Sequence, residues 1–210
     1  APMVLSNMSK QEHDLDKPER LSSCGRPAPW VTMALLDDDL NEVAHDEAGE
    51  ICVRAPLVMK GYKDMPEQTE EAMTGGWLHT GDIGRLDEDG FLYIVDRKKD
   101  MVVSGGFNVF PREVEDVISA HEAVAQVAVI GVPDEKWGES VKAVVVLKAG
   151  VEASDALSAE LTALVKEAKG SVQAPKSVDY ADAIPVTAVG KPDKKVLRAQ
   201  YWENSGRSVG

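Results

Sequence analysis

The chain has 210 residues, of which 43% are hydrophobic and 28% charged, a balance typical of one ordinary or two small globular domains with a packed core. The formal net charge of -13 argues against non-specific binding to nucleic acid or to anionic membranes, because both need a basic surface. No apolar run reaches the roughly 18 residues that a membrane-spanning helix needs, so no span is expected.

The two cysteines and four histidines are scattered along the chain. They show neither the pattern of a disulfide framework nor the spacing of a metal site, and we expect no metal to be held by these side chains alone. The first ten residues lack the basic and then apolar character of a signal peptide, so a cytoplasmic location is the default expectation.

The first part of the chain is predicted to be β-rich. After an irregular, proline-containing start, strand patterns occupy 31–37 and 50–55, where short apolar runs are bounded by turn residues. The acidic segment 65–73 has the pattern of a short helix. Residues 82–86 and 91–96 flank the turn Asp-Glu-Asp-Gly, which predicts a β-hairpin.

The character of the sequence changes after the charged run Arg97–Asp100, which we take as a domain boundary. The segments predicted after it are a hairpin around Gly-Gly at 101–110, a helix at 111–121, strands at 124–132 and 141–148, a helix from the cap Ser154 to near Gly170, a strand at 177–184 and a helix at 191–202. This order predicts a small α+β domain with a three-stranded core sheet plus a β-hairpin.

Four segments of the sequence occur in one order: GEICVRAPLVMKGY (49–62), WLHTGD (77–82), DRKKDMVVSGGFNVFPREVE (96–115) and VGKPDKKVLR (189–198). Some of them are weak signals by themselves. In this order and at these spacings they resemble the late core motifs of the adenylate-forming superfamily, which contains acyl- and aryl-CoA synthetases, peptide-synthetase adenylation domains and beetle luciferases. The resemblance covers roughly residues 20–200.

The resemblance implies an α+β fold in two parts. Residues 1–98 would be the β-rich C-terminal end of the large domain of the family, including a small β-barrel-like subdomain. Residues 99–210 would be the mobile C-terminal lid domain.

Thr80-Gly81-Asp82 lies in the second of the four segments. We expect it in a loop, where Gly81 lets a ligand come close to the backbone and the Asp82 carboxylate can accept two hydrogen bonds from the vicinal hydroxyls of a ribose. Such a tripeptide alone is usually only a turn. The resemblance implies that Asp82 binds the adenosine ribose and that Arg97 contacts the ribose or a phosphate.

The resemblance also implies which residues form the hinge and which contact CoA. Lys99 matches the hinge about which the C-terminal domain of the family rotates, presenting one face for adenylation and another for thioester formation. Ser104, Gly105 and Gly106 match the backbone past which the pantetheine arm of CoA slides, although they also suit a tight β-turn. Trp137 lies where CoA synthetases contribute to the CoA surface, and an indole there could equally cover the core.

Lys191 matches the Gly-Lys of the last family motif, although Ala188-Val189 stand where the family usually has Ser or Thr before the glycine. Adenylation crowds negative oxygens as a carboxylate attacks the α-phosphate, and a flexible ammonium group can bridge them. The resemblance therefore implies that Lys191 is the catalytic residue. Lys194 and Lys195 fall in the predicted helix and are expected to be solvated.

The phosphate-binding loop of the superfamily and its Tyr-Gly-x-Thr-Glu motif, whose glutamate helps to hold magnesium, do not occur in this sequence. We therefore expect the Mg²⁺ ligand and the acyl pocket to lie upstream, and the chain alone to be inactive. The implied reaction joins a carboxylate to ATP as acyl-AMP and then transfers the acyl group to CoA with release of AMP.

The amino-acid sequence of the hinge segment (96–115) looks most like that of fatty-acyl-CoA synthetases. The expected partners are therefore a fatty acid and CoA. Four alternatives stay open: an aryl-CoA ligase, an adenylation domain that loads a carrier protein, a luciferase-like oxidase, and a non-enzymatic lid fragment. Neither the length of the acyl chain nor the oligomeric state follows from the sequence.

Overall fold

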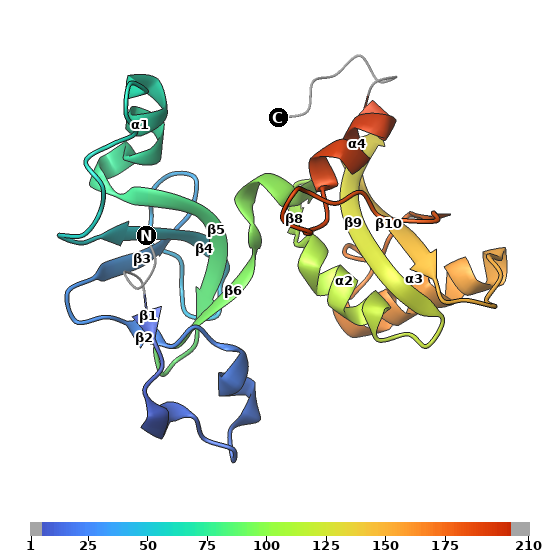
Figure 1. Ribbon diagram of the computed structural model, residues 1–210, viewed down its shortest axis with the longest axis horizontal. Helices are drawn as coiled ribbons and strands as arrows, with labels where there is room; N and C mark the ends of the chain where they lie inside the picture. Colours follow the sequence, from blue (N-terminus) through green and yellow to red (C-terminus); the bar gives the residue numbers. More distant parts are fainter. Residues whose placement is uncertain (1–5, 203–210) are drawn as a thin grey trace. The chain divides into compact units, whose positions relative to one another are not determined.

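The computed structural model describes residues 6–202, and the chain divides into two compact units, Ala1–Lys98 and Lys99–Gly210. Both units mix helices with antiparallel strands (Figure 1), which confirms the predicted α+β class. No helix in the described part of the chain is long and apolar enough to cross a membrane.

The first unit is built on a four-stranded antiparallel sheet in the order β3-β4-β5-β6. Its elements are the strands β1 (Ser6–Asn7), β2 (Arg26–Pro27), β3 (Thr32–Leu36), β4 (Gly49–Arg54), β5 (Leu78–Leu86) and β6 (Leu92–Arg97), the α-helix α1 (Pro66–Ala72), and the 3-10 helices η1 (Lys10–Glu12), η2 (Pro18–Ser22) and η3 (Thr74–Gly76). The strands and the helix predicted before residue 97 are therefore confirmed.

The expected barrel-like closure of this first unit is wrong. Within residues 6–98 the strands form an open sheet whose outer strands, β3 and β6, do not pair with each other. Closure is unnecessary because separate clusters bury apolar side chains against the sheet. One contains Leu35, Ile51, Val53 and Leu92, and the other contains Ala34, Leu36 and Cys52 with the indole of Trp77 packed against them.

The second unit contains a five-stranded sheet in which the hairpin and the three core strands are joined. Its elements are β7 (Val102–Ser104), β8 (Phe107–Val109), α2 (Pro111–Ser119), β9 (Val124–Asp134), β10 (Gly138–Leu147), α3 (Asp155–Lys169), β11 (Ser177–Tyr180) and α4 (Lys194–Trp202), preceded by the 3-10 turn η4 (Lys98–Asp100). β10 pairs with β9, β11 and β7. The predicted core sheet and hairpin are thus confirmed.

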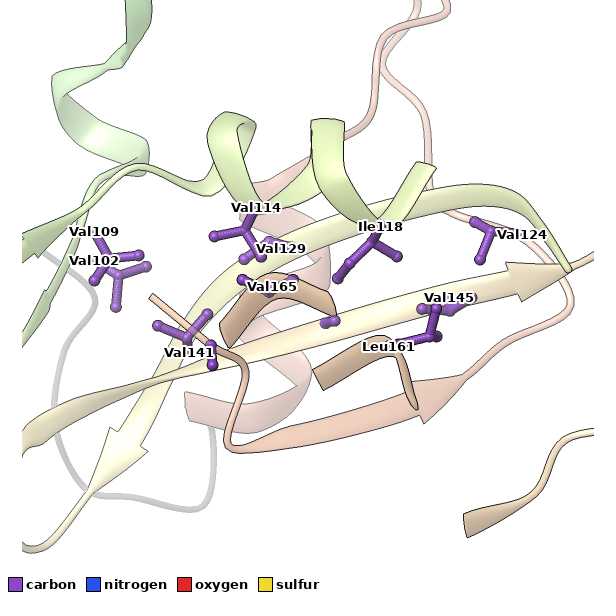
Figure 2. Close-up of a cluster of buried hydrophobic side chains, with 12 residues drawn as sticks. Val102, Val109, Val114, Ile118, Val124, Val129, Val141, Val145, Leu161 and Val165 are labelled. Carbon is purple, nitrogen blue, oxygen red and sulfur yellow. The ribbon is translucent and has the colours of Figure 1, made fainter. Parts of the chain in front are cut away.

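The two long strands β9 and β10 are apolar on both faces because helices cover both. Val129, Ala143 and Val145 belong to the cluster that α2 and α3 cover with Val114, Ile118, Leu161 and Val165 (Figure 2). The alternate residues Ala128, Ile130 and Val144 pack with Leu197 of α4. The predicted cap of α3 is also confirmed, since the Ser154 hydroxyl accepts a hydrogen bond from the backbone N–H of Leu157 at 3.2 Å.

Limited proteolysis tests the division of the chain. Brief digestion with trypsin should make its first internal cut within Arg97–Lys99, because the side chain of Lys99 is exposed and the link joins two separately packed cores. Gel electrophoresis and mass spectrometry should detect two resistant fragments that match the units. A first cut inside 111–150 would contradict this division.

Candidate functional site

The structure brings Asp82 and Arg97 together in the first unit. They are paired across β5 and β6, and Arg97 Nε lies 3.3 Å from Asp82 Oδ1. Both side chains keep access to solvent, with 60% of Arg97 and 32% of Asp82 exposed. Two groups that are well separated in the sequence therefore present one carboxylate and one guanidinium at the same end of a hairpin.

Thr80-Gly81-Asp82 was expected in a loop, and this expectation is wrong, because the tripeptide lies within the strand β5. The strand is bulged there: Glu50 pairs with Ile83 and Cys52 with His79, so that extra residues of β5 lie opposite Ile51. Gly81 has φ +72°, a conformation that glycine adopts at little cost. We name residues 80–82 the β5 bulge.

Side chains replace the ladder hydrogen bonds that the β5 bulge interrupts. The Thr80 hydroxyl donates to the carbonyl of Ile51 at 2.8 Å and accepts from the N–H of Asp82 at 3.2 Å. The N–H of Gly81 donates to Glu50 Oε1 at 3.1 Å. The backbone immediately before Asp82 is therefore held by a carboxylate from the neighbouring strand.

Glu50 is a buried carboxylate, with 7% of its side chain exposed. Its second oxygen, Oε2, lies 2.9 Å from His79 Nδ1 and accepts a hydrogen bond from Lys98 Nζ at 3.1 Å. Lys98 also pairs with Asp38 at 2.8 Å. Burial by itself raises the pKa of Glu50, but the hydrogen bonds from His79, Lys98 and Gly81 together outweigh it and leave the pKa below its usual value.

Glu50, Cys52 and His79 offer one ligand atom each within 4.8 Å of one another, so the geometry alone would admit a metal ion. The charges do not favour one, because the ammonium of Lys98 already balances Glu50. Burial also raises the pKa of the Cys52 thiol to about 12, so without a bound metal the thiol keeps its proton at neutral pH. These side chains therefore form a hydrogen-bonded network in which Lys98 balances the charge of Glu50.

The sequence analysis placed Glu50 in a predicted strand but did not identify it as a functional residue. The available signal was a single acid inside the strand segment Glu-Ile-Cys-Val, since an acidic residue in an apolar strand is rarely fully buried without a partner. His79 and Lys98, the partners, lie 29 and 48 residues away in the sequence, so local patterns do not reveal them.

The residues on each side of the boundary between the units are held by contacts within their own unit. Before it, the side chain of Lys98 is held within the first unit by Glu50 and Asp38. After it, Arg198 of α4 donates to the carbonyl of Lys99 at 3.0 Å and to Asp100 Oδ1 at 3.2 Å within the second unit. The side chain of Lys99 is exposed.

Ser104, Gly105, Gly106 and Trp137 lie together in the second unit. Gly105 and Gly106 form the turn of the β7–β8 hairpin, with φ +60° and +84°, which is the positive pair that a type I′ turn requires. The N–H of Gly105 donates to the carbonyl of Trp137 at 2.9 Å. A Cβ atom at position 105 would come 2.5 Å from the indole, so only glycine fits.

Much of this surface remains accessible. Trp137 is 42% exposed and Phe107 61% exposed, and Lys136 Nζ lies 4.4 Å from the centre of a ring of Trp137. The alternative that Trp137 simply covers the core is not favoured by this exposure. The turn, the aromatic rings and the ammonium form what we name the hairpin surface.

Lys191 lies on a turn rather than in a helix. The pattern predicted a helix from 191, but α4 begins at Lys194, because the Asp193 carboxylate caps it by accepting the N–H of Val196 at 3.1 Å, while Pro192 forms a bridge with Val186. The N–H of Thr187 donates to the carbonyl of Lys191 at 2.7 Å, and the N–H of Lys191 donates to the Thr187 hydroxyl at 3.2 Å. Lys191 is exposed, and no carboxylate within the described residues pairs with it.

The expectation that Lys194 is solvated is wrong. Its ammonium pairs with Glu115 Oε1 at 2.7 Å, and only 13% of its side chain is exposed. The same carboxylate oxygen accepts the backbone N–H of Val129 at 2.7 Å, so Glu115 connects α2, β9 and α4. Lys195 is exposed, as expected.

Comparison with known proteins gives two family matches. The model for AMP-binding enzymes matches residues 2–63, and the model for the C-terminal domain of AMP-binding enzymes matches residues 113–191. Both matches agree with the resemblance of the four sequence motifs.

Two curated relatives are bacterial ligases. One is a medium/long-chain-fatty-acid–CoA ligase of Mycobacterium tuberculosis. The match covers the whole of this chain and 37% of the ligase, with 56% of the aligned residues identical. The other is a long-chain-fatty-acid–CoA ligase of Salmonella typhimurium. The match covers 94% of this chain and 34% of the ligase, with 46% of the aligned residues identical. The chain thus spans about a third of the length of these relatives.

A solved structure with a similar fold is the o-succinylbenzoate CoA synthetase of Bacillus subtilis in complex with its acyl-adenylate intermediate. It is 35% identical, with a TM-score of 0.77 over 98% of this chain and 39% of the other.

The buried network around Glu50 predicts a stability that depends on pH. A carboxylate whose pKa is lowered by folding stabilises the folded state above its unfolded pKa, and this stabilisation is lost as the pH falls through the folded pKa. We expect Glu50→Gln to destabilise the protein at pH 7 by about 1.5–3 kcal/mol, the range for hydrogen bonds to a charged group. Urea unfolding should show this difference shrinking below about pH 4.5. The exposed Glu88→Gln is the matched control, and an equal Glu50→Gln effect at pH 7 and pH 3 would contradict the assignment.

Proposed function

Because the chain belongs to the adenylate-forming family of AMP-binding enzymes, we propose that it is the C-terminal part of an ATP-dependent fatty-acyl-CoA ligase. The reaction joins a fatty acid to ATP, giving acyl-AMP and pyrophosphate, and then transfers the acyl group to CoA with release of AMP. The observation that carries the proposal is the pairing of Asp82 with Arg97 on adjacent strands, since it presents an acceptor and a cation together, as a nucleotide requires.

The nucleotide role divides between these two side chains. The Asp82 carboxylate would accept hydrogen bonds from the two ribose hydroxyls. The Arg97 guanidinium, which is 60% exposed, would contact the ribose or a phosphate and can donate several hydrogen bonds in one plane. Their mutual contact at 3.3 Å keeps each oriented before the nucleotide arrives.

The catalytic role belongs to Lys191 in this proposal. Attack of the carboxylate on the α-phosphate brings negative oxygens together, and a mobile ammonium group stabilises that arrangement. Support comes from the exposed turn that carries Lys191 and from the ion pair that occupies Lys194. No carboxylate among residues 6–202 forms an ion pair with Lys191, whereas Glu115 neutralises Lys194.

The hinge role belongs to Lys99. The Lys98 side chain is held in the first unit and the Lys99 carbonyl in the second. Rotation that preserves both attachments is thus concentrated in the bonds between these two groups, and a hinge needs only a few such bonds. In the thioester-forming orientation the hairpin surface, with Ser104, Gly105, Gly106 and Trp137, would border the pantetheine arm of CoA.

The fatty acid is proposed as substrate from the two curated relatives, which are named as fatty-acid–CoA ligases. Mg²⁺ is proposed to accompany ATP and to be held by residues outside this chain, since no phosphate-binding loop or Tyr-Gly-x-Thr-Glu segment occurs in it. The chain alone is therefore proposed to lack activity.

Replacement of Lys191 tests the proposed function. The 210 residues would be fused to the part of the Mycobacterium tuberculosis relative that they do not cover, and the two half-reactions measured separately. Lys191→Ala should slow acyl-AMP formation, followed by pyrophosphate exchange, by about 10²–10³-fold, as for loss of one preorganised electrostatic donor. Conversion of supplied acyl-AMP and CoA into acyl-CoA should continue near the parental rate.

Two lysines of the same segment serve as comparisons. Lys195→Ala is the matched control and should change either rate by less than about twofold, because an exposed helix lysine contributes little. Lys194→Ala should lower stability instead, because it leaves Glu115 without its cation. Equal slowing of both half-reactions by Lys191→Ala would count against the two-orientation mechanism.

Replacement of Lys99 tests the hinge in the same fusion. Lys99→Pro fixes φ near −65° and removes the N–H, so it should hinder rotation. Acyl-CoA release should fall much more than pyrophosphate exchange, by about tenfold or more if closure limits the second step. Lys99→Ala keeps the backbone free and should retain both rates. Equal losses in the two half-reactions of Lys99→Pro would place the hinge elsewhere.

A further inference from the structure

We propose that Glu50 is a positioning residue whose buried carboxylate holds the β5 bulge and thereby fixes the direction of the Asp82 side chain. The inference rests on the proposed function only where it regards Asp82 as the ribose ligand. Glu50 lies in β4, on the strand next to the bulge, and it does not pair directly with either Asp82 or Arg97.

The first step of the argument is the backbone of the bulge. Gly81 has no pairing partner in β4, because the register between β4 and β5 shifts between Glu50 and Cys52. Its N–H would lack a strand acceptor, and Glu50 Oε1 accepts it at 3.1 Å. Since the peptide between Gly81 and Asp82 follows directly, loss of this acceptor frees the rotation of the backbone that directs the Asp82 carboxylate.

The second step concerns the other end of the nucleotide pair. Glu50 Oε2 accepts from the ammonium of Lys98 at 3.1 Å, and Lys98 is the residue after Arg97. One carboxylate therefore binds the residue before Asp82 and the residue after Arg97. Because β5 and β6 pair these two residues, Glu50 restrains both strands of the hairpin where the proposed nucleotide ligands lie.

The third step explains why the position requires a carboxylate. Three donors or potential donors surround it, from Gly81, His79 and Lys98. An ionised carboxylate accepts at both oxygens, whereas an amide would present an NH₂ group to one side. Glutamine can therefore keep the bond to Gly81 only by placing its NH₂ group towards Lys98 and His79.

The thiol of Cys52 and the imidazole of His79 do not supply an alternative anchor for the bulge. Cys52 Sγ contacts His79 Nδ1 at 3.4 Å, and His79 Nε2 lies 3.2 Å from the carbonyl of Thr74. Neither side chain is hydrogen-bonded to the N–H of Gly81, which makes His79 a suitable control position.

Amide hydrogen exchange of the ¹⁵N-labelled 210-residue chain tests the proposal without any nucleotide. Glu50→Ala should speed exchange at Gly81 by about tenfold or more, as expected for loss of one hydrogen bond to a charged group. Exchange at Asp82 should also speed up, because its N–H donates to the Thr80 hydroxyl of the same bulge. His79→Ala removes a partner of Oε2 and leaves the bond to Gly81, so Gly81 should stay protected. Unchanged Gly81 exchange in Glu50→Ala, or equal acceleration of every amide in β3–β6, would overturn the proposal.

A pH titration of the unmodified chain keeps the proposal testable if Glu50→Ala does not fold. The amide shift of Gly81 should follow the titration of the Glu50 side-chain carbon in acid, and the Gly81 amide should not follow exposed acids such as Glu88. A Gly81 shift that stays constant while Glu50 titrates would overturn the proposal. Neither measurement involves Asp82 as a ligand, so failure of the nucleotide assignment would be seen separately, in nucleotide binding.

Discussion

The antiparallel pairing of β5 with β6 brings a carboxylate and a guanidinium to the same end of a hairpin, and the proposed nucleotide site depends on that register. A slip of one residue would move each side chain to the opposite face of the sheet. The bulge at 80–82 adds a local distortion, and the N–H groups of Gly81 and Asp82 are bound by Glu50 and Thr80 rather than by the ladder between β4 and β5. The site therefore rests on a buried carboxylate that does not belong to the hairpin itself.

That carboxylate is stable where it is because its charge and its hydrogen bonds are both satisfied. An unpaired buried carboxylate is costly, and breaking a buried pair by removing one partner usually destabilises a protein strongly. Lys98 provides the opposite charge, and it is also the last residue of the first unit. The Glu50–Lys98 ion pair therefore stabilises the bulge and also holds the last residue of the first unit in place.

Elements with local signals were predictable from the sequence. The Gly105-Gly106 turn, the Ser154 cap and the apolar strands β9 and β10 follow from residue types over short spans. Features set by distant partners were not. Thr80-Gly81-Asp82 resembles a loop, but Glu50 and Ile51 hold it in a strand. Lys194 looks solvated by helical position, and Glu115 pairs with it from another helix.

Within the described part of the chain, some lysines form ion pairs that hold the fold and others, such as Lys191, form none. Lys98 and Lys194 are bound by carboxylates of low exposure, so their ammonium groups are fixed in place. A transition state that gathers negative oxygens is stabilised by a cation whose charge is not already neutralised by a protein carboxylate. Had α4 begun three residues earlier, at Lys191, the backbone of that residue would be part of the helix. The Asp193 carboxylate accepts the N–H of Val196 at 3.1 Å and caps the helix after this position, so Lys191 stays on an exposed turn, which is consistent with the catalytic role proposed for it.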